Sequence, residues 1–146
     1  MSGYFLGIDI GAAASKAVVI DGQKKIMGAV VIPSGTNYAT TAAAVKAEAL
    51  KQASLQLADI TSSAATGIGG RNAGAESYHG VIICDARGVN LTFPSARTVI
   101  DIGGQGSQVI TMNGEGRVIN FNVSEICATG SARLLQVVAR ILQISI

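Results

Sequence analysis

Two short segments of this chain carry the same pattern of carboxylate and glycine. They are Ile8-Asp9-Ile10-Gly11 and Ile100-Asp101-Ile102-Gly103, at an offset of 92 residues. Each places a carboxylate at the end of an apolar run, just before a glycine-rich turn where backbone can approach a ligand closely. Carboxylates with retained water suit Mg²⁺, and exposed backbone N–H groups suit phosphate. Two such turns facing each other predict a nucleotide cleft, with Asp9 and Asp101 as its catalytic carboxylates and as water-mediated Mg²⁺ ligands.

The residues that follow each carboxylate complete the candidate site. Lys16, five positions after Gly11, can supply a point charge to a phosphate. We predict that the nucleotide contacts both turns, at Gly11, Ala12, Ala13, Ser15, Lys16, Gly103, Gly104 and Gln105. The alternative, in which Gly11 and Gly103 serve only as tight turns between strands, stays open at this point.

The elements that position these turns repeat along the chain. Apolar runs predict strands at 4–10, 16–20, 26–32 and 62–68, and an Ala-rich segment without Gly or Pro predicts a helix at 36–57. At the offset of 92, Ser15 falls on Ser107, Lys16 on Gln108, and the hairpin signal Asp21-Gly22 on Asn113-Gly114. A second helix is expected at 126–142. Residues 71–94 stay open between helix and strand.

This internal repeat predicts an α/β fold, and its duplicated hairpins resemble those of the ribonuclease-H-like, actin-like ATPase superfamily. Each unit is expected to run strand-strand-strand-helix-strand with a mixed sheet. The predicted subdomains are residues 1–95 and 96–146. The second unit stops before a closing strand, so we expect either a fragment or completion by another chain.

Composition excludes several other classes of protein. The formal net charge of +2 and the lack of a Lys/Arg cluster argue against nucleic-acid binding. Apolar stretches are interrupted well short of about 18 residues, so no membrane anchor is expected. No basic region precedes Phe5-Leu6, which argues against a signal peptide. The two cysteines are too few for a disulfide framework, so a reduced, cytoplasmic location is the default.

Several segments resemble one family of ATPases in that fold class. The resemblance spans nearly the whole chain in the family's order, and its specific parts are Ile100-Asp101-Ile102-Gly103-Gly104-Gln105 and Cys127-Ala128-Thr129-Gly130. Weaker parts are Gly7 to Gly11 with Ser15-Lys16, Ala65-Thr66-Gly67, Arg71-Asn72 and Cys84 to Gly88. The chain is similar to activators of 2-hydroxyacyl-CoA dehydratases and to ATPase subunits of benzoyl-CoA reductases.

The resemblance implies a function. Such activators are homodimers that share one [4Fe–4S] cluster, and ATP binding and hydrolysis drive a low-potential electron into a partner dehydratase or aryl-CoA reductase. The implied cofactors are therefore ATP/ADP, Mg²⁺ and the cluster. Cys127 matches the first cluster ligand, at the expected start of a helix whose dipole favours a thiolate. As an alternative, Cys127 is a small buried apolar residue, as we read Cys84 to be.

The chain also departs from the family's pattern. The family's second cluster cysteine and the family's adenine-binding segment have no counterpart in this sequence. Ala12 and Ala13 replace hydroxyl residues, Gly106 replaces an Asp, and Gln108 replaces a Lys. All of these changes weaken phosphate and metal chemistry, so we expect this chain to turn over ATP poorly or not at all. The single histidine, His79, is expected on the surface.

Two other functions remain open. One is a catalytically silent relative that acts as an assembly or regulatory module, favoured by Ala12, Ala13 and Gly106 and opposed by Asp9, Asp101 and Cys127. The other is a sugar or acyl kinase of the same superfamily, which would need a substrate domain and a catalytic base that the sequence does not display.

Overall fold

The computed structural model describes residues 3–103, 106–124, 139 and 141–144. The chain divides into two compact units, Met1–Val81 and Ile82–Ile146. The sequence-based boundary at 95/96 differs from this division, because the helix at 81–92 belongs almost entirely to the second unit. That the two units are the two ATPase subdomains remains a prediction.

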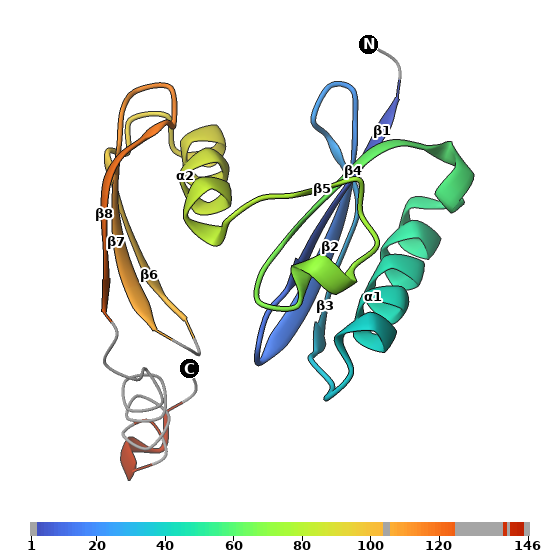
Figure 1. Cartoon of the computed structure of the whole chain (residues 1–146), viewed down its shortest axis with the longest axis horizontal. Helices are drawn as coiled ribbons and strands as arrows, with labels where there is room; N and C mark the ends of the chain where they lie inside the picture. The colour runs from blue at the N-terminus through green and yellow to red at the C-terminus, as the bar shows by residue number, and fades with distance from the viewer. Residues whose placement is uncertain (1–2, 104–105, 125–138, 140, 145–146) are drawn as a thin grey trace. The chain divides into compact units, whose positions relative to one another are not determined.

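The first unit is built on a five-stranded mixed sheet with the order β3-β2-β1-β4-β5. Strands β1 (Tyr4–Ile10), β2 (Ala14–Asp21) and β3 (Ile26–Pro33) form an antiparallel meander, whereas β4 (Ile60–Thr66) and β5 (Ser77–Tyr78) run parallel to β1. Figure 1 shows helix α1 (Tyr38–Ala53) alongside this sheet. The predicted α/β class is confirmed, as are the strands β1 to β4 and the helix, whereas β5 lies in the segment that sequence left open.

Alternation of side chains explains the core of the first unit. Leu6, Ile8 and Ile10 of β1 point to the α1 face and are at most 3% exposed, because successive residues of a strand alternate between faces. They pack with Ala17 and Val19 of β2 and with the buried side of α1, which comprises Ala42, Val45, Ala49 and Leu50. Burial of these aliphatic groups supplies the main stabilising term for the unit.

Capping sets the ends of α1, which is shorter than the predicted 36–57. Asn37 begins it, since its Oδ1 accepts a hydrogen bond from the Thr40 N–H at 3.1 Å. Ser54 ends it with a left-handed backbone (φ 56°) and donates its N–H to the carbonyls of Leu50 and Lys51. These hydrogen bonds end the helix before Leu55, although leucine and glutamine favour helix.

The segment that sequence left open contains short elements and a helix. The 3₁₀ turn η2 (Gly70–Asn72) stands at the start of residues 71–94, and β5 follows at Ser77–Tyr78; another 3₁₀ turn, η1 (Leu57–Asp59), precedes β4 and lies outside that segment. Residues Val81–Thr92 then form helix α2, so Val81-Ile82-Ile83 are helical rather than extended. Helix α2 ends two residues before Pro94, as expected where proline disfavours helical backbone in the preceding residue.

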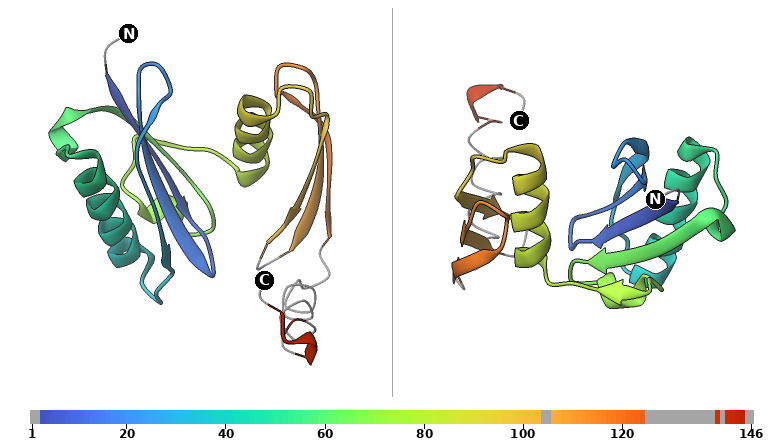
Figure 2. Two further views of the ribbon diagram at one scale, coloured as in Figure 1. Left: turned by 180° about the vertical axis from the view of Figure 1, so that it is seen from behind. Right: turned by 90° about the horizontal axis from the view of Figure 1, so that it is seen from above.

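The second unit contains an antiparallel sheet of strands β6 (Thr98–Ile102), β7 (Ser107–Met112) and β8 (Val118–Ser124) in that order. Helix α2 packs on one face, where Ala86 meets Ile110 and Met112, and all three are at most 1% exposed. Figure 2 shows α2 against this sheet in both views. Within the described residues, no helix is long and apolar enough to cross a membrane.

The two meanders have the same register at the offset of 92. Asp9 pairs with Lys16 in the first unit, and Asp101 pairs with Gln108 in the second. The register shift between β2 and β3 at Val19/Ile20 recurs between β7 and β8 at Thr111/Met112. A one-residue slip would turn every side chain to the other face, so matched registers support a true duplication.

The hairpin turns repeat down to single hydrogen bonds. Oδ1 of Asp21 accepts from the N–H groups of Gln23 and Lys25, and Oδ1 of Asn113 accepts from those of Glu115 and Arg117. The left-handed position of each turn is Lys24 (φ 66°) or Gly116 (φ 69°). Either carboxylate or amide oxygen can make this turn, which explains why Asp and Asn exchange between the copies.

Candidate functional site

An ion pair marks the end of β1 in the first unit. Nζ of Lys16 lies 2.8 Å from Oδ2 of Asp9, and the two side chains are 48% and 33% exposed. The pair follows from the antiparallel register, which puts Asp9 and Lys16 opposite each other on the face away from α1. Because both groups reach solvent, a bound anion or cation can compete for either partner. The structure therefore brings together two of the predicted site residues.

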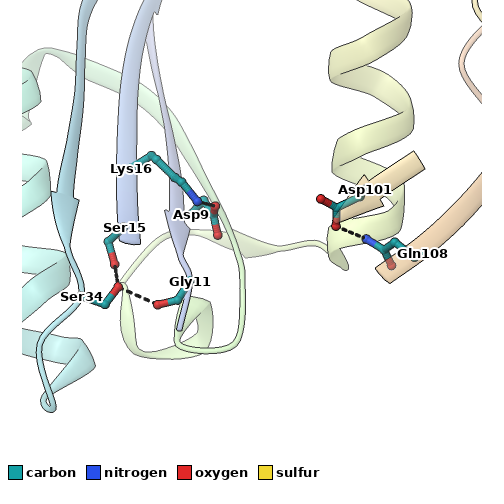
Figure 3. Close-up of polar contacts among 7 residues, drawn as sticks. All are labelled: Asp9, Gly11, Ser15, Lys16, Ser34, Asp101 and Gln108. Carbon is teal, nitrogen blue, oxygen red and sulfur yellow. Dashed lines mark hydrogen bonds and ion pairs between the residues drawn. The ribbon is translucent and has the colours of Figure 1, made fainter. Parts of the chain in front are cut away.

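Two serine hydroxyls, of which that of Ser15 is buried, support the first turn. Ser34 Oγ donates to the Gly11 carbonyl at 2.6 Å and lies 2.7 Å from Ser15 Oγ (Figure 3). Since the single proton of Ser34 is used on Gly11, Ser15 is the donor to Ser34. Ser15 is fully buried, so its hydroxyl holds the shape of the turn instead of facing solvent. Sequence reasoning missed Ser34, because its partner lies 23 residues away.

The tip of this turn is open to solvent. Ala12 and Ala13 are exposed, and the carbonyl of Ala13 accepts the Ser34 N–H at 3.0 Å. A Cβ at Gly11 would lie 2.6 Å from the Ala14 carbonyl oxygen, so the turn is too tight for any side chain there. Methyl groups at residues 12 and 13 leave backbone groups as the only polar atoms of the tip.

Gly67, which follows β4, lies directly against the Asp9 carboxylate. Its φ is +85°, and a Cβ there would collide with Oδ1 of Asp9 and the carbonyl of Ile10. The next turn is held by the Gly69 N–H, which donates to the Ile10 carbonyl at 2.9 Å. Arg71 stacks over the Tyr78 ring at 4.5 Å from its centroid, beside this loop. The sequence placed Gly67 in a segment that resembles the family but did not predict it as a site residue, although glycine suits a close approach of backbone to the site.

The second turn has an amide where the first has an ammonium. Nε2 of Gln108 donates to Oδ2 of Asp101 at 3.0 Å and to Oδ2 of Asp85 at 3.0 Å. Asp85 belongs to α2, so this amide ties the helix to the end of β6. The Gly103 N–H donates to the Gly106 carbonyl at 2.9 Å and closes the turn. Figure 3 shows the Asp101–Gln108 contact.

Other predicted residues fall outside the described part of the chain. Gly104, Gln105 and Cys127 belong there, as does most of the expected helix at 126–142. In the described residues, no three His, Cys, Asp or Glu side chains gather as a metal site would require. Cys84 is a free, partly buried thiol on α2, and His79 is exposed, as expected.

Comparison with known proteins identifies relatives of this chain. The profile of the BadF/BadG/BcrA/BcrD ATPase family matches residues 6–146. The activator of lactoyl-CoA dehydratase from Anaerotignum propionicum is 38% identical over 141 residues, which cover 96% of this chain and 54% of that protein. The chain thus spans about half the length of this relative.

Two solved structures agree with the fold as well as the sequence. The activator of the 2-hydroxyisocaproyl-CoA dehydratase from Clostridium difficile, with bound ADPNP, has a TM-score of 0.84 at 36% identity, over 97% of this chain and 53% of that one. Component A of the Acidaminococcus fermentans (R)-2-hydroxyglutaryl-CoA dehydratase has a TM-score of 0.87 at 34% identity, over 99% and 56%.

Proposed function

Because this chain belongs to the BadF/BadG/BcrA/BcrD ATPase family, we propose that it is the nucleotide-binding part of an ATP-dependent activator. The activator would couple ATP hydrolysis to low-potential electron transfer into a 2-hydroxyacyl-CoA dehydratase or a benzoyl-CoA reductase. It would work as a cytoplasmic homodimer. The observation that carries this proposal is the pair of Asp-Ile-Gly turns, which stand at the same register in two copies of one meander.

The first turn fits a magnesium-bound nucleotide. The Asp9 carboxylate reaches solvent, and Gly67, which has no Cβ, lets the backbone after β4 lie directly against it. Asp9 and Asp101 would hold Mg²⁺ through its water ligands, and the metal would neutralise developing phosphate charge. Lys16 would exchange its partner Asp9 for a phosphate oxygen. Backbone of residues 11–13 and 103–105 would line the phosphates, while Ser15 supports the turn.

The proposed iron–sulfur cluster rests on family membership and on Cys127. One cysteine of this chain would bind a [4Fe–4S] cluster together with ligands from elsewhere in the homodimer. The cluster would supply one-electron transfer at low potential. Cys84 on α2 is not assigned to it.

Calorimetric titration of Mg-ADP and Mg-ATP into the purified chain tests the nucleotide site. We expect micromolar binding, about −8 kcal/mol. An Asp9→Asn variant should bind more weakly, because it loses the carboxylate that holds the hydrated metal. A wild-type chain that releases no heat and shows no binding at millimolar nucleotide would contradict the proposal.

Iron content after anaerobic reconstitution tests the cluster. We expect Cys127→Ala to lose most of the bound iron and Cys84→Ala to retain it. Equal iron in the two variants would contradict the assignment of Cys127, whatever the result with nucleotide.

A second candidate function is that of a catalytically silent assembly or regulatory module. Ala12 and Ala13 at the tip of the first turn favour it, as does the uncharged amide of Gln108 at the second. Nucleotide binding without phosphate release, in a chain that also lacks iron, would support this function over the first.

A further inference from the structure

We propose that the Thr66 hydroxyl is a ligand-binding group of the Asp9 site and hydrogen-bonds the magnesium–nucleotide complex, through a phosphate oxygen or a metal-bound water. This inference rests on the proposed function and adds a residue to that site.

The first observation is an unused hydroxyl. Oγ1 of Thr66 is buried from solvent and has no hydrogen-bond partner among the residues that the structure describes. Leaving a buried hydroxyl unpaired costs about 1–3 kcal/mol, and most buried polar side chains in proteins find a partner. A group that stays unpaired in the free protein can gain its partner when a ligand binds.

The second observation is position. Thr66 is the last residue of β4 and is the register partner of Asp9 in the parallel β1–β4 pair. Register partners in adjacent strands project to the same face, so Thr66 stands beside Asp9, on the face where Lys16 also lies. Gly67, which approaches the Asp9 carboxylate, is the next residue in the chain.

Rotation of the side chain connects the buried hydroxyl to this face. Thr66 as a whole is only partly buried, although its Oγ1 is covered. Rotation about χ1 to another staggered rotamer moves the hydroxyl to a different position around Cβ. A ligand oxygen at Asp9 would favour the rotamer that satisfies the hydroxyl.

The alternative is that Thr66 is a structural residue with an idle hydroxyl, and the two cases give opposite results in Thr66→Val. Valine keeps the shape and the β-branch but removes the polar group. In both cases the ligand-free melting temperature should equal or exceed that of the wild type. Only a ligand-binding hydroxyl predicts that Mg-ADP binds about tenfold more weakly, as expected for one hydrogen bond to a charged group.

The experiment compares thermal shifts and calorimetric affinities of the full chain with Mg-ADP and with ADP in EDTA. Thr66→Ser should retain wild-type affinity, and Thr66→Ala provides a second hydroxyl-free side chain should valine disturb folding. Thr61→Val, at the exposed opposite end of β4, is the matched control and should bind as the wild type does. If Thr66→Val weakens ADP binding only when Mg²⁺ is present, the hydroxyl contacts a metal-bound water. If it weakens ADP binding in both conditions, the hydroxyl contacts a phosphate oxygen.

Thr66→Val that binds Mg-ADP as tightly as the wild type would overturn this inference and leave the proposed function intact. Thr66→Ser that binds as weakly as Thr66→Val would overturn it as well. A wild-type chain that binds no nucleotide would overturn the proposed function, and this inference with it.

Discussion

At the scale of single residues, the first site depends on close backbone approach as much as on charge. Asp9 makes an exposed ion pair with Lys16, which contributes little to stability because water and salt screen it. Gly67 instead occupies a place that no other residue type fits, since its φ is +85° and its missing Cβ makes room for the Asp9 carboxylate. The charged pair is thus available for a ligand, whereas the glycine fixes the geometry.

Substitution of Gly67 tests this distinction. Gly67→Ala should lower the free energy of unfolding by about 1–3 kcal/mol, since it combines left-handed backbone with a collision at Asp9 and Ile10. Gly74→Ala is the control: its φ is +63°, but its Cβ would meet only Lys46 Nζ, at 3.7 Å. Urea denaturation should show a smaller loss for Gly74→Ala, and nucleotide affinity should fall only for Gly67→Ala. Equal effects at the two glycines would contradict the close-approach argument.

At the scale of elements, the meander occurs twice, so equivalent hairpin turns in the two units can be compared directly. The two hairpin turns share their side-chain acceptor and their hydrogen bonds, but one has lysine and the other glycine at the left-handed position. Gly116 is further restricted, because a Cβ there would lie 2.7 Å from Cβ of Asn90 on α2. The two turns have the same local geometry, but only the turn of the first unit has room for a side chain at its left-handed position.

Substitutions at the left-handed positions of the two turns test whether the left-handed backbone has a similar energetic cost in both. Lys24→Gly should raise the free energy of unfolding by about 0.5 kcal/mol, because relief of left-handed strain slightly exceeds the added entropy of the unfolded chain. Gly116→Ala should lower it by about 1–2 kcal/mol. Chemical denaturation of both variants measures these changes. Destabilisation by Lys24→Gly would show that the two turns are not energetically equivalent.

At the scale of the whole molecule, the chain has the fold of its ATPase family but lacks several polar side chains that the family's pattern places at the two turns. Both carboxylates stand at the ends of their strands, but the second is bonded to the neutral amide of Gln108 where the first meets Lys16. The chain also spans 54% of the length of its relative, the activator of lactoyl-CoA dehydratase.

Because both carboxylates are retained but several phosphate-binding groups are missing, we predict that the chain binds Mg-ATP and hydrolyses it slowly. Steady-state phosphate release from Mg-ATP should stay far below about 1 s⁻¹, the low end of ordinary enzyme turnover. The reason is that the turns lack hydroxyl donors at Ala12 and Ala13 and a cation at Gln108. Asp101→Asn serves as the background control. Release at an ordinary rate that this substitution abolishes would contradict the prediction.

The sequence by itself determined the family, the α/β class and the repeat of Asp-Ile-Gly turns. Those features depend on local patterns: alternation along strands, glycine after a carboxylate, and Asx-Gly hairpins at one offset. The pairing of Asp9 with Lys16 was not among these predictions and comes from the register of β1 and β2 in the structure.

Tertiary structure alone decided which groups surround those turns. Ser34 reaches Gly11 across 23 residues, Gly67 comes to Asp9 through parallel pairing of β1 with β4, and Asp85 reaches Gln108 from a helix. It also decided that Val81–Thr92 is a helix and that it belongs almost entirely to the second unit. Such contacts join residues far apart in the chain, and no local pattern encodes them, because they arise only when sheets and helices bury their apolar faces together.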